Sequence, residues 1–339
     1  MSDNPEVADE LGGVLVADFT TRGPGPYLTQ LLLRLGARVI KFEPPEGDPA
    51  RAMPMFFSAL NAGKESVECD LRSPDGRSLA IAASTRADVV VNSWRPGVAE
   101  RYGLGGATLH RSNPALIHCT VSGYGAGGPL EGRPGQDLSY LAASGALPFV
   151  TSRGPEVPGL PWGDTLAGFH GAMRVCAALL ASHLLGTGKT IEVSVAGTLA
   201  EPALLAQSVA RTPLSANVQV AGKGIFRTSD GKLLAIAVIS EARFWRSLCD
   251  SIGLVQIRHC TFDDRLTRSV ELQDQLKNRL EGLTSAEVEM RLGEAEVPWA
   301  WVTQPGDAIL GGGVPQGPTH AEALGASGAA VREEFDRPN

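Results

Sequence analysis

The sequence has little of what several common protein classes require. Its five cysteines (Cys69, Cys119, Cys176, Cys249 and Cys260) are odd in number, scattered, and never spaced as CxxC. This argues against a disulfide framework or a zinc site and fits free thiols in a reducing compartment. Basic residues are outnumbered, with 30 Lys and Arg against 37 Asp and Glu, for a net charge of −7. Because nucleic-acid binders usually carry a basic face, we expect no nucleic-acid partner.

Targeting and membrane signals are also missing. The N-terminal segment, MSDNPEVADELGG, is acidic and lacks the basic and then apolar order of a signal peptide. No apolar run approaches the roughly 20 residues that a helix needs to span a bilayer. We therefore expect a cytoplasmic protein with no membrane partner.

Two phosphate-binding motifs of α/β proteins are absent as well. After the apolar run at 14–20, the chain reads TRGPGPY (21–27), where a dinucleotide-binding loop would carry GxGxxG. The two prolines remove two amide donors from that loop. Neither GYGAGGP (123–129) nor GTGKT (186–190) fits the P-loop pattern GxxxxGK[ST]. These departures argue against a dinucleotide cofactor and against a P-loop nucleotide site.

What is present suits a soluble α/β protein. Of the 339 residues, 43% are hydrophobic and 20% are charged, which is ordinary for a globular chain of one or two domains. Short apolar runs predict strands, and segments that open with proline or serine and close with glycine predict helices between them. The predicted strands are 14–20, 37–43, 65–71, 87–94 and 114–123, and the predicted helices are 27–36, 73–85 and 95–105. This alternation predicts a doubly wound parallel sheet in a large domain.

The second half of the chain changes character. A long apolar helix is expected at 163–189, ending at Gly186, buried in the core or against another subunit, and a strand follows at 189–195. A smaller α+β domain is expected from a hairpin at 226–240, with Asp230-Gly231 in its turn, helices at 241–253, 269–281 and 285–294, and a strand at 298–303. We predict a large domain over 1–200, a small domain over 218–303, and a Gly-, Pro- and Ala-rich surface tail over 304–339.

Six stretches in matching order resemble the class III CoA-transferases and their sister α-methylacyl-CoA racemases. They include GPGPYLTQLLLRLGARVIKFEPPEGDPAR (23–51), RPGQDLSYLAASGAL (133–147) and WGDTLAGFHGA (162–172), and the likeness runs from about residue 11 to residue 305. The resemblance implies an acyl-CoA substrate, no bound cofactor, and a carboxylic acid as acceptor in the case of a transferase. It also implies a homodimer of two interlocked, ring-like subunits, with the tail returning to the large domain.

Transferases of this family use an aspartate nucleophile in a Gly-Asp pair that opens a helix, and the matching pair here is Gly163-Asp164. A carboxylate that attacks a thioester gives a mixed anhydride and a free CoA thiolate, which splits one hard exchange into two easier steps. At a helix start, we expect the backbone amides and the helix dipole to keep the Asp164 carboxylate ionised and oriented. Taken alone, Asp164 would more readily be interpreted as a simple helix N-cap, and the motif context favours the nucleophile instead.

The pair Gln136-Asp137 separates the two reactions of this superfamily. It matches a His-Asp pair of the racemases, in which the histidine is one of two bases on opposite faces of the α-carbon. An amide cannot exchange protons at neutral pH. We therefore rank acyl transfer through Asp164 above racemisation, with Gln136 orienting the thioester or the anhydride oxygen, and Asp137 on a glycine-flanked turn.

Two alternatives stay open. GPGPY (23–27) is closer to the racemase loop, and Glu241 matches a glutamate near the racemase catalytic pair. A racemase or related α-proton isomerase would use Asp164 with Glu241 or with a water in place of the histidine. The chain could instead be a non-catalytic partner subunit, a role that Gln136 suits and the intact Gly163-Asp164 pair opposes.

The resemblance also implies residues that contact CoA. The stretches that hold its adenine and phosphates contain Lys41, Leu71, Arg72, Arg95 and Arg101. Arg95 is favoured, because it ends a predicted strand and guanidinium groups suit phosphate oxygens, although any of the basic residues could be a solvated surface charge. The loop with Gly123, Tyr124 and Gly125, and with Gly127 and Gly128 beyond them, could bring backbone close to the thioester and supply an oxyanion contact, or be merely flexible. The histidines form no cluster, so we expect no metal site.

Overall fold

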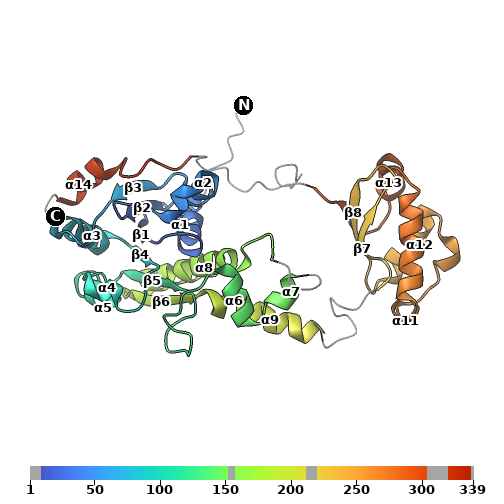
Figure 1. The fold of residues 1–339 in the computed structure, drawn as a ribbon, viewed down its shortest axis with the longest axis horizontal. Helices are drawn as coiled ribbons and strands as arrows, with labels where there is room; N and C mark the ends of the chain where they lie inside the picture. Colours follow the sequence, from blue (N-terminus) through green and yellow to red (C-terminus); the bar gives the residue numbers. More distant parts are fainter. Residues whose placement is uncertain (1–8, 152–156, 211–219, 304–319, 337–339) are drawn as a thin grey trace. The chain divides into compact units, whose positions relative to one another are not determined.

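The computed structural model describes residues 9–151, 157–210, 220–303 and 320–336. The chain divides into two compact units, a larger one formed by residues 1–204 and 313–339 and a smaller one formed by residues 205–312. Figure 1 labels most elements of both units along the chain.

A six-stranded parallel sheet forms the centre of the larger unit, in the order β3-β2-β1-β4-β5-β6. The strands are β1 (Leu15–Phe19), β2 (Arg38–Glu43), β3 (Glu65–Glu68), β4 (Val89–Asn92), β5 (Ile117–Ser122) and β6 (Lys189–Ser194). Apolar side chains of the central strands are buried on both faces, as expected for a parallel sheet covered by helices. The predicted doubly wound sheet is confirmed, and its strand order reverses between β1 and β4.

Helices cover both faces of this sheet. On one face, α1 (Pro24–Arg34) and α8 (Trp162–Leu185) pack against each other and against Val16, Val89 and Ile117. On the other face, α3 (Pro74–Arg86) and α5 (Gly106–Ser112) cover Ala17, Ile40 and Val90 (Figure 1). Successive residues of one strand therefore belong to different apolar clusters, which is the alternation that a strand imposes. The remaining elements are η1 (Pro49–Ala52), α2 (Pro54–Asn61), α4 (Val98–Arg101), α6 (Asp137–Ser144), α7 (Leu147–Val150), α9 (Val195–Ala210) and α14 (Gly328–Asp336).

The long apolar helix α8 is only partly buried. Its small residues, among them Ala167, Gly171 and Val175, face the sheet and α1, while Phe169 is 52% exposed and Leu184 is 71% exposed. By length and composition alone this 24-residue helix could cross a membrane, so the expectation that no such segment exists was wrong. Core helices of soluble proteins pass the same test, and one whole face of α8 packs on the sheet.

The helices α6 and α14 lie where the sequence patterns predicted a turn and a surface tail. Asp137 was expected on a glycine-flanked turn, but it is the first residue of α6, which ends at Gly145 in the left-handed region. In the tail, α14 packs against α3 and β3, and Val331 and Phe335 are buried. An amphipathic spacing of two apolar residues therefore outweighs the Gly-rich composition that surrounds it.

The smaller unit is an α+β fold around the antiparallel sheet β7 (Lys223–Arg227), β8 (Leu233–Ala237) and β9 (Trp299–Trp301). Its helices are α10 (Ala242–Ile252), η2 (Val255–Ile257), α11 (Phe262–Thr267), α12 (Ser269–Glu281) and α13 (Ser285–Leu292). The predicted hairpin turn is present, with Gly231 at φ 86°. Arg265 is buried in the core, where its guanidinium donates to the carbonyls of Ala221, Val238 and Ile239. These bonds engage both terminal nitrogens of a guanidinium that has no acidic ion-pair partner among the described residues, while its buried Nε lacks a hydrogen-bond partner there.

Candidate active site

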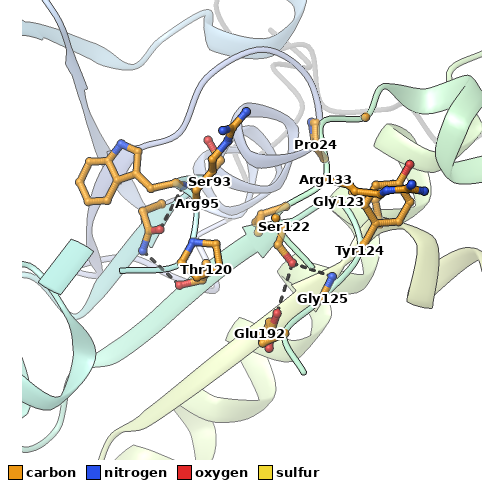
Figure 2. A pocket seen from close by; sticks show the side chains of 18 of the residues that line it. Pro24, Ser93, Arg95, Thr120, Ser122, Gly123, Tyr124, Gly125, Arg133 and Glu192 are labelled. Atoms are coloured by element: carbon orange, nitrogen blue, oxygen red, sulfur yellow. Dashed lines mark hydrogen bonds between the residues drawn. The ribbon is translucent and has the colours of Figure 1, made fainter. Parts of the chain in front are cut away.

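A cavity of about 650 Å³ lies in the larger unit where the strand order reverses. Its walls are the segments that follow β1 (21–24), β4 (92–97) and β5 (120–126), together with residues 132–136 and Asp164 of α8. Figure 2 shows side chains from these segments around the opening. Ligands of doubly wound sheets bind at this place, outside the carboxyl ends of the strands, so the fold itself points to this cavity as the functional site.

Asp164 lies in the first turn of α8 and presents its carboxylate to the cavity next to Gly23. A Cβ atom placed on Gly23 would come within 2.1 Å of Asp164 Oδ2, so only glycine leaves room for the carboxylate. No described residue donates a hydrogen bond to this carboxylate. Burial first, and the negative charge of Asp137 second, raise the pKa of Asp164 to about 6.

We expected backbone amides at this helix end to stabilise the Asp164 carboxylate, but one of them binds the carboxylate of Asp137 instead. The Asp164 N–H donates to Asp137 Oδ1 at 3.0 Å, so Asp137 caps the start of α8. Gly163 makes this possible, because a Cβ there would lie 2.8 Å from the same oxygen. Contrary to expectation, this amide of the helix end therefore does not favour ionisation of the Asp164 carboxyl. Its pKa is raised because the carboxylate is desolvated and has a negative neighbour.

Gln136 immediately precedes α6 and lines the cavity with an exposed side chain. Its backbone N–H donates to Ser139 Oγ at 2.8 Å, which fixes the start of α6. The structure thus brings Gln136 and Asp164 to one cavity, while Asp137 lies behind them and holds the helix that carries Asp164. The roles predicted for Gln136 and Asp137 in the reaction itself stay predictions.

The glycine-rich loop after β5 forms another wall. Gly123, Tyr124 and Gly125 all line the cavity. The Gly125 N–H donates to Ser122 Oγ at 3.1 Å, and this hydroxyl donates to Glu192 Oε1 at 3.2 Å (Figure 2). Since the Gly125 amide is already engaged, an oxyanion contact from this loop would have to come from another amide.

Tyr140 of α6 packs under this loop and against the acidic pair. A Cβ on Gly123 would lie 2.5 Å from the Tyr140 ring, and the rings of Tyr124 and Tyr140 meet edge to face at 5.0 Å. Burial, and then Tyr124, Asp164 and Asp137, raise the pKa of Tyr140. Its phenol is therefore a neutral group beside the acidic pair.

Of the residues predicted to contact CoA phosphates, Arg95 lies at the cavity. It follows β4, lines the opening and is exposed, and its guanidinium has no ion-pair partner among the described residues (Figure 2). Lys41 is the opposite case, because it is 1% exposed and its ammonium pairs with Asp48 at 3.0 Å. A contact between Lys41 and CoA stays a prediction, without support from its position.

The other three predicted contacts lie outside the cavity lining. Arg72 is 65% exposed and paired with Asp70 at 2.7 Å, and Leu71 packs on an apolar cluster of the sheet. Arg101 lies over the ring of Tyr102, with its guanidinium carbon 5.9 Å from the ring centre. Their contact with CoA remains a prediction.

Sequence reasoning missed two basic residues of the site. Arg22 and Arg133 both line the cavity and are exposed, and neither guanidinium has an ion-pair partner among the described residues. A signal was available, because Arg133 begins a motif of the family resemblance, Arg22 directly precedes another, and each lies beside a glycine or a proline of a turn.

Glu241 belongs to the smaller unit. It is the exposed residue that precedes α10, and its carbonyl accepts the N–H of Trp245 at 3.2 Å. Its predicted catalytic role stays a prediction.

Comparisons with known proteins agree on one family. The model of CoA-transferase family III matches residues 11–331. The chain is 30% identical over 300 residues to succinyl-CoA--D-citramalate CoA-transferase of Chloroflexus aurantiacus, covering 81% of this chain and 73% of that one. It is 32% identical over 257 residues to alpha-methylacyl-CoA racemase of Homo sapiens, covering 72% and 65%.

Two solved structures share the fold. A CAIB/BAIF family protein from Brucella suis has a TM-score of 0.82 at 24% identity, covering 96% of this chain and 99% of that one. The Rv3272 protein of Mycobacterium tuberculosis has a TM-score of 0.75 at 28% identity, covering 86% and 84%.

Proposed function

Since the chain belongs to CoA-transferase family III, we propose that it moves CoA from an acyl-CoA to a carboxylic acid, with Asp164 as the nucleophile. The observation that carries this proposal is the bare carboxylate of Asp164 at the cavity, close against Gly23 and without a donor from the described residues. A carboxylate that no donor stabilises is more reactive toward a thioester carbonyl than a solvated one. With a pKa of about 6, it is mostly ionised at neutral pH.

The reaction balances in two symmetric halves. An Asp164 oxygen attacks the thioester carbonyl and the C–S bond breaks, which gives a mixed anhydride and CoA thiolate. The thiolate then attacks the Asp164 carbonyl of the anhydride, so that the donor acid leaves and an aspartyl thioester remains. The acceptor carboxylate then attacks the aspartyl thioester, which gives a second mixed anhydride and CoA thiolate. The thiolate attacks the acceptor carbonyl of this anhydride, which forms the new acyl-CoA and restores Asp164.

The cavity lining supports this assignment with polar groups of suitable charge. Arg22, Arg95 and Arg133 present guanidinium groups to the cavity, and such groups pair with phosphate and carboxylate oxygens through parallel hydrogen bonds. We assign Arg95 to the phosphates of CoA. Gln136, an uncharged donor and acceptor near Asp164, suits the orientation of the thioester or anhydride oxygen.

One observation favours an α-proton isomerase as the second candidate. A carboxyl with a pKa of about 6 is well matched to proton abstraction at neutral pH, and one relative is a racemase. Racemisation also needs a proton donor on the opposite face of the α-carbon. Gln136 cannot fill that role, and the carboxylates of Glu100 and Glu192 are the other acidic groups on the described lining.

The test is incubation of the purified protein with a 2-methylacyl-CoA and a free carboxylic acid in D2O, followed by mass spectrometry of the CoA thioesters. Transfer predicts a thioester of the added acid and no deuterium in the donor. One deuterium at the α-carbon without acid exchange would establish the isomerase instead. Turnover of either kind by the protein alone would exclude a non-catalytic partner subunit.

Variants tie the activity to the proposed nucleophile. Asp164→Ala should abolish transfer, and substantial remaining transfer would refute the role of Asp164. The matched control is Asp75→Asn, since Asp75 is an exposed carboxylate in the first turn of α3 that does not line the cavity. This control should transfer CoA at the wild-type rate.

A further inference from the structure

We propose that the buried ion pair of Lys41 and Asp48, which lies outside the cavity, acts as a clamp that positions the turn beside Asp164. The clamped turn is residues 20–23, between β1 and α1. The proposal rests on the proposed function only in taking Asp164 as the reacting group. It makes Lys41 and Asp48 positioning residues and gives Lys41 a role other than CoA binding.

The clamp engages the turn through both of its charges. Lys41 Nζ donates to the carbonyl oxygen of Thr20 at 2.8 Å. The Asp48 carboxylate accepts the Arg22 N–H, with Oδ1 at 3.1 Å and Oδ2 at 3.2 Å. The two charges pair with each other at 3.0 Å, and their side chains are 1% and 0% exposed. The buried ion pair therefore binds both the Thr20 carbonyl and the Arg22 N–H. Charge-assisted hydrogen bonds are strongest in such a buried setting.

The turn needs such support because its backbone is strained. Arg22 has φ 72°, and among the described residues it is the sole non-glycine residue with a positive φ. The left-handed region is unfavourable for a residue with a Cβ atom, and it persists only where the surroundings enforce it. Here the enforcing contact is the bond from the Arg22 N–H to Asp48.

The strained turn borders the reacting group directly. Gly23 follows Arg22, is buried, and approaches Asp164 so closely that an added Cβ would lie 2.1 Å from Oδ2. Thr21 is held on the side of β4, where its N–H donates to Ser93 Oγ at 3.1 Å. If the clamp is released, Arg22 can relax to negative φ, and the wall at Gly23 moves away from the carboxylate and admits water.

The first test is Asp48→Asn, which removes the charge and one of the two accepting oxygens. We expect kcat to fall about 10- to 100-fold, since a misplacement of about 1 Å near a reacting centre has effects of this size. The KM for acyl-CoA should change by less than about 3-fold, because the pair does not line the cavity. If kcat/KM instead fell by the same factor because KM rose, with kcat unchanged, the proposal would be overturned.

A double-mutant cycle isolates the backbone effect. Glycine adopts positive φ without cost. Adding Arg22→Gly to Asp48→Asn should therefore raise kcat at least about 10-fold above that of Asp48→Asn alone. The matched control is Arg22→Ala in the same background, which also lacks the guanidinium but keeps the Cβ atom, and it should restore nothing. If both double variants behave alike, Asp48 does not act through the Arg22 backbone.

Asp48→Asn leaves Lys41 unpaired in the core and could prevent folding. The double variant Lys41→Met with Asp48→Asn removes both charges, and it should fold and show the same loss of kcat. A wild-type kcat in this folded variant would refute the clamp.

A readout that does not depend on turnover separates this proposal from the proposed function. The pKa of the Asp164 carboxyl can be titrated by ¹³C NMR of chains labelled at aspartate Cγ, with Asp164→Asn to assign the signal. Within the described part of the chain, the titratable groups that interact with this carboxyl are Asp137 and Tyr140, and neither is substituted in the clamp variants. We expect about 6 in the wild type and a value closer to the ordinary one after clamp removal. An unchanged pKa would refute the clamp, whatever reaction the protein catalyses.

Discussion

Replacement of Asp164 by asparagine should make the protein more stable at neutral pH, and the gain should shrink in acid. Burial and the charge of Asp137 raise the pKa of Asp164 from 3.8 to about 6 in the folded chain. The folded state therefore binds this proton more tightly than the unfolded state, and ionised Asp164 lowers the free energy of unfolding. One pKa unit corresponds to about 1.4 kcal/mol, so the complete effect is at most about 3 kcal/mol. Partial solvent contact of the side chain reduces it to about 2 kcal/mol.

The pH dependence follows from the two pKa values. Below about pH 4 the carboxyl is protonated in both states, so wild type and Asp164→Asn should have equal stability. As the pH rises from about 4 to about 6, the unfolded chain releases the proton first and the variant gains its advantage. Above about pH 6 the proton has left both states, and the difference stays constant.

Urea unfolding followed by circular dichroism, at several values between about pH 4.5 and pH 8, measures this difference. We expect it to grow by about 1 to 2 kcal/mol in favour of Asp164→Asn over that range. Asp75→Asn should show no such growth. A difference that is the same at every pH, or a wild type that is more stable at the alkaline end, would refute a desolvated carboxyl at position 164.

Three further predictions concern the same site. Gly23→Ala should abolish turnover while leaving the chain folded, because its Cβ would collide with Asp164 Oδ2; a kcat within about 10-fold of the wild type would contradict this close approach. Asp137→Asn should keep the cap on α8, because an amide oxygen also accepts the Asp164 N–H, and should shift the acid limb of the pH–rate profile to lower pH, because the negative neighbour that raises the pKa of Asp164 is gone. Gln136→His should introduce exchange of the α-proton of a 2-methylacyl-CoA in D2O, measured by mass spectrometry, because a titrating base then lines the same cavity as Asp164; no deuterium uptake would mean that position 136 does not reach the α-carbon.

Local patterns sufficed to predict much of the fold. The central strands of the large sheet were predictable, because a parallel strand buried on both faces must be a short apolar run, as at Val89–Asn92. Helix limits followed from Ser73 and Pro74 at the start of α3 and from Gly186 at the end of α8. The helix α6 was missed, because the glycine and proline before it favour a turn when only neighbouring residues are considered.

The site was harder to predict, because its decisive contacts join distant segments. Asp164 was identified by its motif, yet nothing local to it reveals that Gly23 closes over its carboxylate or that Asp137 takes its amide. Lys41 resembled a surface cation that could bind phosphate, but it is buried and paired with Asp48. Charge in a sequence indicates neither burial nor partner, so assignments based on residue type fail most often for such groups.

The two neighbouring carboxylates explain how the proposed nucleophile can stand at a helix start without a hydrogen bond from its own amide. Free amides at a helix N-terminus normally stabilise an adjacent carboxylate, which lowers both its pKa and its reactivity. Here Asp137 accepts the Asp164 N–H, so the helix is capped and the amide is satisfied without use of the Asp164 carboxylate. Asp164 is left desolvated and beside a second negative charge, at a cost to folding that the Asp164→Asn experiment measures. The same cost raises the ground-state energy of the proposed nucleophile. A carboxylate that is less stable in the ground state has a smaller barrier to cross when it attacks a thioester.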